Sequence, residues 1–351
     1  MAGAAVHIVR LEPVGVELEV EEGETVLDAA FRQGIGVPHG CKEGRCSACK
    51  CRLIEGDVEL LKYSTFALNE YERETDHILL CRTHAYSDIV VEMMNFDEDL
   101  LKRSIAVKEY EATLVEVEAL TRDIRRLAVV VAEPFRCWAG QYCDITVPGT
   151  GVTRSYSMSS LPLSTRLEFI IKKYPTGAFS SLLDGALAPG RKLLLKGPYG
   201  TCFRREEREG PMVLVGGGSG MAPLWAILND HIRSGERRPV RFFYGARTQA
   251  DLFYLDRFAE IAATLPDFTF IPALSDAADD GSWHGETGFI HEVLARRLAA
   301  EGFMGETIDA YLCGPAPMID AAMPVLQMHG VEPDRVFVDK FTPAAQAFSV
   351  A

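Results

Sequence analysis

The stretch "PHGCKEGRCSACKCRL", residues 38–53, decides the fold of the first part of this 351-residue chain. It places Cys41, Cys46, Cys49 and Cys51 within eleven positions, although the whole chain contains only nine cysteines. Cytosolic thiols stay reduced, so a dense cluster of cysteines in such a chain indicates a metal centre rather than disulfides. The first question is therefore which metal these thiols bind.

The spacing of the cysteines predicts an iron–sulfur cluster. Three of them form a C-x4-C-x2-C pattern, and a fourth follows at the end of the apolar segment "HILLC". This is the spacing of plant-type [2Fe–2S] sites, in which one loop supplies three thiolates and a distant residue supplies the last. The expected ligands are Cys41, Cys46, Cys49 and Cys81.

A zinc site built from the same thiolates is the alternative. Structural zinc sites usually pair two C-x2-C knuckles, whereas here Cys81 stands alone. Cys51 lies on the strand that leaves the cluster loop, and we interpret it as a small core residue rather than a ligand.

The composition limits the classes of function. Apolar residues make up 48% of the chain and charged residues 25%, which predicts a folded globular protein. The net charge of −14 argues against nucleic-acid binding, which needs a basic face. No apolar run approaches the length of a membrane helix, and "MAGAAVHIVRLEPVG" lacks the features of a signal peptide, so we expect a cytoplasmic protein that does not engage a membrane.

The charge is unevenly distributed along the chain. Residues 1–98 contain nineteen acidic and nine basic residues, a formal charge of −10, and the other 253 residues carry −4. An acidic first domain suggests a protein partner with basic patches, although the charge could also serve only solubility.

Residues 1–98 are predicted to form an α+β domain. The segments "VHIVRL" and "GVELEV" alternate around Glu12-Pro13 as a hairpin does, and Thr25 and Gly34 delimit a helix. A second hairpin is predicted to turn at Gly56-Asp57, and "HILLC" and "DIVVEM" are expected strands. The charged segment 99–106 is the predicted linker.

Two further domains are predicted after the linker. Residues 107–207 contain short strands separated by turn residues, as in a small antiparallel β-barrel. Residues 208–351 alternate strands and helices, which predicts a parallel α/β sheet.

Two motifs in the barrel domain point to a phosphate-bearing ligand. The first is "RSYSMSS", residues 154–160, which alone could be a solvated strand face. The second is "KKYPTGAFSSLL", in which Gly177 precedes Ser180 and Ser181 at the expected start of an apolar helix. Backbone and hydroxyl donors at a helix N-terminus suit a pyrophosphate.

The α/β domain has two motifs of its own. "MVLVGGGSGMAPLWAIL" is a strand, a glycine loop and a helix, and a lone glycine loop is a weak sign of nucleotide binding. "YLCGPAPM" ends a strand at the carboxyl edge of the sheet, where open α/β sheets bind ligands. Cys313 within it could equally be a packed thiol.

Together these motifs resemble the ferredoxin–NADP reductase superfamily, with a β-grasp ferredoxin domain, an FAD-binding barrel and an NAD-binding domain. The resemblance implies that Arg154 pairs with the FAD pyrophosphate, that Tyr156 packs on the isoalloxazine and that Ser157 bonds near its N5. Gly177 and Ser180 would seat the phosphates. The implied FAD-binding set is completed by Ser155, Lys172, Phe179 and Ser181.

On the nicotinamide side the resemblance implies that Cys313 lies beside C4 and that Phe341 covers the flavin until the nicotinamide displaces it. An exposed Phe near the end of a chain could instead be packing. Arg247 in "GARTQADLF" could meet a 2′-phosphate, but this form looks like NADH-using reductases, so NADH is the expected donor. The implied loop and edge residues are Gly216, Gly217, Gly218, Ser219, Gly220, Gly314 and Pro315.

The domain order resembles reductase components of bacterial multicomponent oxygenases, most closely those of soluble diiron monooxygenases of the methane and propane type. This implies electron flow from NADH to FAD to the [2Fe–2S] cluster and then to a diiron hydroxylase, with a small coupling protein as a further partner. Two alternatives are a reductase for a Rieske-type dioxygenase and a zinc-stabilised adaptor without activity.

Overall fold

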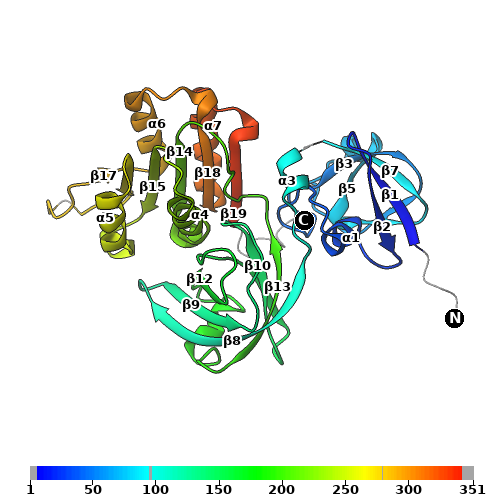
Figure 1. Ribbon diagram of the computed structural model, residues 1–351, viewed down its shortest axis with the longest axis horizontal. Coiled ribbons are helices and arrows are strands. Elements are labelled where there is room, and N and C mark those ends of the chain that lie inside the picture. The colour runs from blue at the N-terminus through cyan, green and yellow to red at the C-terminus, as the bar shows by residue number, and fades with distance from the viewer. Residues whose placement is uncertain (1–5, 95–96, 279, 342–351) are drawn as a thin grey trace. The chain divides into compact units, whose positions relative to one another are not determined.

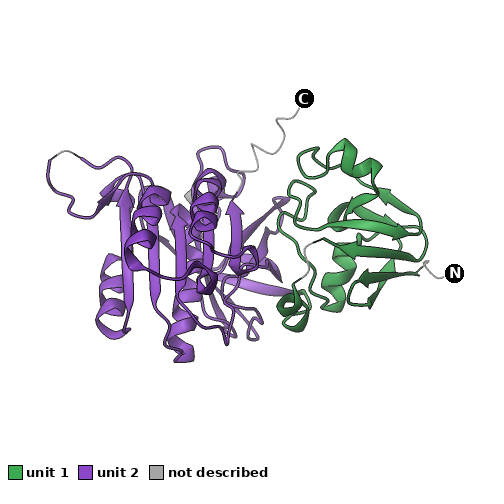
Figure 2. Ribbon diagram, turned by 90° about the horizontal axis from the view of Figure 1, so that it is seen from above, with its two compact units in different colours: residues 1–108, 347–351 green, residues 109–346 purple. Residues whose placement is uncertain are grey.

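The computed structural model describes residues 6–94, 97–278 and 280–341 (Figure 1). The chain divides between Lys108 and Glu109 into two compact units, which we call unit 1 and unit 2 (Figure 2). The predicted barrel and α/β domains both lie in unit 2.

Unit 1 is built on a five-stranded sheet of order β2-β1-β7-β3-β5, in which β1 and β7 are parallel and the other pairs antiparallel. The predicted helix is α1 (Val26–Gln33): the Thr25 side chain accepts from the Asp28 N–H, and Gly34 ends it at φ 68°. The strands are β1 (Val6–Glu12), β2 (Val16–Glu21), β3 (Lys50–Glu55), β5 (His77–Leu79) and β7 (Ile89–Met93).

The predicted hairpin at Gly56-Asp57 is wrong. Both edges of β3 are already occupied, by β5 and by β7, so no edge is left for the strand that follows. That strand, β4 (Val58–Leu60), pairs instead with β6 (Thr83–Ala85) in a separate two-stranded sheet. Two short helices, α2 (Glu70–Glu74) and η1 (Leu80–Arg82), complete this part of unit 1, and Cys81 lies in η1 rather than at the end of a strand.

The predicted linker, residues 99–106, makes contacts with unit 1. Helix α3 (Glu98–Lys102) begins just before it, with the Asp97 side chain accepting from the Leu100 N–H. The Ser104 hydroxyl donates to the carbonyl of Gly34, and the Val107 N–H donates to the carbonyl of Phe31 at 3.1 Å. A Cβ at Gly36 would overlap the carbonyl oxygen of Leu100, so the contact is close. Residues 97–107 are therefore fastened to unit 1.

The first half of unit 2 is the predicted antiparallel β-barrel, a six-stranded sheet of order β11-β10-β13-β8-β9-β12. Inward-facing apolar side chains such as Leu114, Ile145 and Phe169 are fully buried in its core. The strands are β8 (Lys108–Ala119), β9 (Ile124–Val131), β10 (Tyr142–Val147), β11 (Val152–Ser157), β12 (Arg166–Lys172) and β13 (Lys192–Tyr199).

The second half of unit 2 is the predicted parallel sheet, of order β17-β16-β15-β14-β18-β19. Helices α4 and α5 pack on one face and α6 and α7 on the other, because alternate residues of β14 enter two separate cores. The strands are β14 (Met212–Gly217), β15 (Val240–Ala246), β16 (Phe268–Leu274), β17 (Glu286–Thr287), β18 (Asp309–Pro315) and β19 (Val336–Phe341). The helices are α4 (Met221–Ser234), α5 (Leu255–Thr264), α6 (Ile290–Glu301) and α7 (Ala316–Met328).

The strand order of this sheet creates a switch point. The chain proceeds outward from β14 through β15 and β16, then crosses back so that β18 lies on the other side of β14. Ligands of open α/β sheets bind at the carboxyl ends of the strands where this reversal occurs. Both predicted nucleotide motifs lie at the carboxyl ends of β14 and β18.

Candidate functional site

The four predicted cluster ligands form two thiol pairs in unit 1. The Cys41 N–H donates to the sulfur of Cys46 at 3.3 Å, and the sulfurs of Cys49 and Cys81 are 3.3 Å apart. Cys49 and Cys81 are buried, whereas Cys41 and Cys46 are half-buried. A [2Fe–2S] cluster needs four thiolates; the four cysteines lie here as two pairs, and in the described part of the chain no group of three or more His, Cys, Asp or Glu side chains is arranged to hold a metal ion.

The loop between these cysteines presents N–H groups to sulfur. The N–H groups of Glu43, Arg45 and Cys46 all point at Cys41 Sγ, at 3.2 to 3.4 Å. Together with the thiol of Cys46, which contributes most, they lower the pKa of Cys41 to about 5. Contact with Cys49 and burial raise the pKa of Cys81. The three N–H groups thus stabilise negative charge on the Cys41 sulfur, as a thiolate ligand requires.

The motif "RSYSMSS" lies on β11, an edge strand of the barrel sheet, and its side chains alternate between two faces. Arg154 and Tyr156 share one face, and no carboxylate among the described residues forms an ion pair with Arg154. Ser155 lies on the other face, where its hydroxyl donates to Asp144 at 2.6 Å. Arg154 is therefore available to a phosphate, whereas the Ser155 side chain is directed away from it.

The glycine turn that follows the barrel strand β12 differs from its prediction. No α-helix follows Gly177; the chain forms the short 3₁₀-helix η2 (Ser180–Asp184), which Gly185 ends. The Ser180 hydroxyl is used inside the turn, donating to Tyr174 O at 2.8 Å and accepting from its N–H at 3.1 Å. A Cβ at Gly177 would overlap that hydroxyl, so the turn requires glycine. The helix-terminus argument for the pyrophosphate accordingly does not apply here.

This turn nevertheless lies against the β11 motif. The rings of Tyr156 and Phe179 have centroids 4.8 Å apart, and Phe179 is fully buried. Ser181 lies beside the turn, where its hydroxyl donates to the carbonyl of Ala178 at 3.1 Å. The structure thus brings the two predicted FAD motifs together.

Ser157 reaches the α/β half of unit 2. Its hydroxyl donates to the Asp339 carboxylate on β19 at 3.0 Å, and Asp339 is the strand partner of Cys313 on β18. Burial raises the pKa of Asp339 to about 6, and the Ser157 hydrogen bond opposes the shift. Burial also raises the pKa of Cys313 well above its ordinary value. Ser157 and Cys313 are buried and Asp339 is half-buried, and the three residues lie close together where β11 meets β18 and β19.

The glycine loop packs directly on the neighbouring strand end. A Cβ at Gly220 would overlap the carbonyl of Cys313, and a Cβ at Gly217 would lie 2.9 Å from Met318 Sδ. The Tyr244 hydroxyl donates to the Gly218 carbonyl at 2.9 Å and holds the loop from the other side. This close approach leaves backbone, rather than side chains, at the predicted nucleotide edge.

The remaining predicted residues lie around that edge. Lys172 is 3.4 Å from Asp123 and close to Gly218. Phe341 is the strand partner of Pro315. Arg247 follows β15, is 72% exposed and lies 3.9 Å from the carboxylate of Asp276. The side chain of Arg247 is thus exposed to solvent, whereas that of Cys313 is fully buried.

Sequence reasoning missed Asp339 and Cys202. Asp339 is an acidic residue in the apolar strand "VFVDKF", two positions before Phe341, and that contrast could have drawn attention to it. Cys202 lies beyond β13, and its sulfur is 3.6 Å from that of Cys313. No local pattern predicts a contact between residues 111 positions apart.

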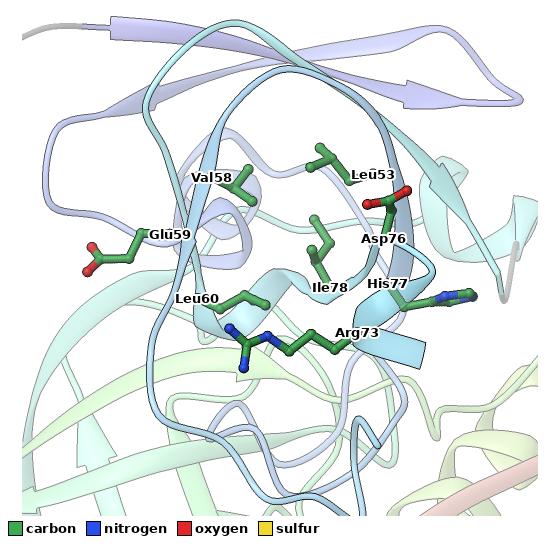
Figure 3. Close-up of a pocket in the computed structure, with 8 residues that line it drawn as sticks. All are labelled: Leu53, Val58, Glu59, Leu60, Arg73, Asp76, His77 and Ile78. Atoms are coloured by element: carbon green, nitrogen blue, oxygen red, sulfur yellow. The ribbon is translucent and has the colours of Figure 1, made fainter. Parts of the chain in front are cut away.

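A separate hollow of about 450 Å³ lies in unit 1 between β4 and the β3–β5 pair. Figure 3 shows Leu53, Val58, Leu60 and Ile78 directed into it, with Glu59 and His77 pointing away. None of the predicted cluster ligands lines it, so it is distinct from the cluster site.

In the described part of the chain, no helix is both long and apolar enough to cross a bilayer.

Comparison with protein families divides the chain into three domains. Residues 9–86 match the 2Fe-2S iron-sulfur cluster binding domain, residues 111–203 the oxidoreductase FAD-binding domain, and residues 214–323 the oxidoreductase NAD-binding domain. The zinc alternative is thereby replaced by a [2Fe–2S] domain.

Individual proteins match over nearly the full chain. The reductase component of propane 2-monooxygenase from Mycolicibacterium goodii is 46% identical over 342 residues, covering 96% of this chain and 97% of the relative. The reductase component of phenol 2-monooxygenase from Pseudomonas sp. (strain CF600) is 35% identical, with 96% and 95% coverage. The crystal structure of Amycolatopsis cytochrome P450 reductase GcoB superposes with a TM-score of 0.86 at 32% identity, with 96% and 99% coverage.

Proposed function

We propose that this chain, which belongs to the family of monooxygenase reductase components, delivers electrons to the diiron hydroxylase of a small-alkane monooxygenase. In this family a [2Fe–2S] domain is joined to FAD- and NAD-binding domains of the ferredoxin–NADP reductase type. The similarity to propane 2-monooxygenase reductases over almost the whole chain carries this proposal.

When bound, FAD and the cluster would supply the redox chemistry that divides the electron pair of NADH into single electrons. The residues of the chain bind, orient and tune these groups. In our proposal Cys41, Cys46, Cys49 and Cys81 bind the iron, and the N–H groups of residues 43, 45 and 46 stabilise the Cys41 thiolate.

On the flavin side we propose that Arg154 neutralises the FAD pyrophosphate, because its guanidinium has no carboxylate partner among the described residues. Tyr156, which is partly buried against Phe179, would pack on the ring system. Ser157 would place its hydroxyl, already oriented by Asp339, near the flavin N5.

On the nicotinamide side, the backbone edge formed by Gly216–Gly220 and Cys313–Pro315 would receive the dinucleotide. Cys313 would lie beside the nicotinamide C4, and Phe341 would cover the flavin until the nicotinamide displaces it. NADH is the proposed donor: the carboxylate of Asp276 is 3.9 Å from Arg247, and a negative charge there disfavours a 2′-phosphate.

The acidic character of unit 1 supports a partner with basic patches, because residues 1–98 carry a formal charge of −10. We assign that partner as the hydroxylase, with a small coupling protein as a further component. A cytoplasmic location fits, because all nine cysteines are free thiols.

A direct test uses the purified full-length protein under anaerobic conditions. We expect a visible spectrum with flavin and [2Fe–2S] bands that NADH bleaches, and we expect a propane-type diiron hydroxylase to restore it. Faster recovery with a Rieske-type dioxygenase would favour that second class of partner. A colourless protein without iron or FAD would refute the proposal.

The same assay tests the role of charge. Electron transfer to the hydroxylase should slow as ionic strength rises, whereas reduction by NADH should change little, because salt screens exposed charges over about 10 Å at 0.1 M. Transfer that does not respond to salt would exclude electrostatic steering by unit 1.

A further inference from the structure

Two buried thiols in unit 2 lie in contact. The sulfurs of Cys202 and Cys313 are 3.6 Å apart, although the residues are 111 positions apart in sequence. Their exposed fractions are 2% and 0%. A disulfide has a sulfur–sulfur distance of about 2.05 Å, so the two sulfurs would have to approach by only about 1.5 Å to form one.

The two residues differ in how firmly they are held. Cys313 lies within β18 and is paired on one side with Gly216 and on the other with Asp339, so its backbone is fixed. Cys202 lies in the irregular segment between β13 and β14, where the chain has no strand partners. The Cys202 carbonyl nevertheless packs against Gly140 and the Arg204 N–H donates to Ala139, so the approach of the sulfurs must come mainly from rotation of the side chains.

We propose that Cys202 and Cys313 form a reversible disulfide that switches off hydride transfer. The oxidant is a hydroperoxide, the class of product that reduced flavoproteins release when their electrons reach oxygen. One thiol attacks the peroxide oxygen and becomes a sulfenic acid with loss of water. The second thiol then displaces the sulfenic oxygen as water, so two thiols and one hydrogen peroxide give one disulfide and two waters.

The functional consequence rests on the proposed function, in which Cys313 lies beside the nicotinamide. The disulfide would remove the Cys313 thiol and tie the strand edge to the segment beyond the barrel. Burial raises the pKa of Cys313, and thiolates are the reactive form of cysteine. The pair therefore reacts slowly and stays reduced during ordinary turnover.

The test uses the full-length protein loaded with FAD and cluster. Hydrogen peroxide is added and then removed with catalase, and NADH-dependent reduction of ferricyanide is measured, because this acceptor takes electrons without the hydroxylase. We expect the wild type to lose most of this activity and to regain it with dithiothreitol. Mass spectrometry of unreduced peptides should show residues 202 and 313 joined, lighter by two hydrogens.

Two variants provide the comparison. Cys202→Ala should keep its activity through the treatment, because no second thiol remains to close the bond. Cys137→Ala removes another buried thiol of unit 2, one with no thiol contact in the described residues, and should behave as the wild type. If Cys202→Ala does not fold, the peptide cross-link in the wild type still decides the question.

Absence of the cross-link in active, peroxide-treated protein would overturn the proposal. So would an irreversible loss with sulfinic acid at Cys313, or a reversible loss in Cys202→Ala equal to that of the wild type. Failure of NADH to reduce the untreated protein would instead count against the proposed function, even if the cross-link formed.

Discussion

Replacing Asp339 by asparagine should change how the stability of unit 2 depends on pH. The pKa of Asp339 is raised from 3.8 to about 6, mainly by burial. Between these values the carboxyl of the unfolded chain has lost its proton while that of the folded chain keeps it. Above about pH 6 the folded chain must hold a half-buried charge. The free energy of unfolding of the wild type therefore falls as pH rises through this window.

The size of the effect follows from the shift. About two pKa units at 1.36 kcal/mol each correspond to a loss of up to about 3 kcal/mol between about pH 4 and about pH 6. Asparagine carries no charge, and its side-chain oxygen can still accept from the Ser157 hydroxyl. Asp339→Asn should therefore lack this fall and be the more stable protein above about pH 6.

The assay is urea unfolding of the full-length chain followed by tryptophan fluorescence. All three tryptophans, Trp138, Trp225 and Trp283, lie in unit 2, so the signal reports that unit alone. Asp144→Asn is the matched control, because it alters an exposed Ser–Asp hydrogen bond of the same kind. Ser157→Ala should move the fall to higher pH, because it removes a hydrogen bond to the charged form. Parallel curves for wild type and Asp339→Asn would refute the reasoning.

Three other changes separate the cofactor sites. Cys81→Ser should abolish the cluster and electron delivery to the hydroxylase while NADH still reduces the flavin, as visible spectra would show; intact delivery would contradict the ligand assignment. Arg154→Ala should weaken FAD binding by roughly 1.5–3 kcal/mol, the usual value of a charge-assisted hydrogen bond. Arg166→Ala, on the same barrel but in an exposed ion pair, should leave FAD affinity unchanged in an equilibrium titration. Gly220→Ala should impair reduction by NADH but retain flavin and iron, because its Cβ would overlap the carbonyl of Cys313; normal NADH kinetics would show that the loop can move away.

The sequence predicted those features that local chemistry determines. The Thr25 cap and Gly34 stop of α1, the barrel strands and the alternation of strands and helices after residue 208 all follow from patterns a few residues long. The C-x4-C-x2-C spacing is equally local. The comparisons with known domains confirm the cofactor classes and the fold derived from these patterns.

The wrong or missing predictions concern features that depend on contacts with other segments of the chain. The hairpin at Gly56 fails because β7, some 35 residues later, takes the strand edge that the hairpin would need. The α-helix predicted after Gly177 does not form, and the Ser180 hydroxyl instead closes a turn on Tyr174. The contact of Ser157 with Asp339 joins residues 182 positions apart, and no periodicity in either segment indicates it.

The fastening of residues 97–107 to unit 1 has a mechanical consequence. Val107 still donates to Phe31, and β8 begins at Lys108, so scarcely one peptide is left between the last anchor and the first barrel strand. The stretch that joins the anchored segment to the barrel is therefore limited to a few backbone torsion angles, and residues 97–107 do not act as a long flexible tether.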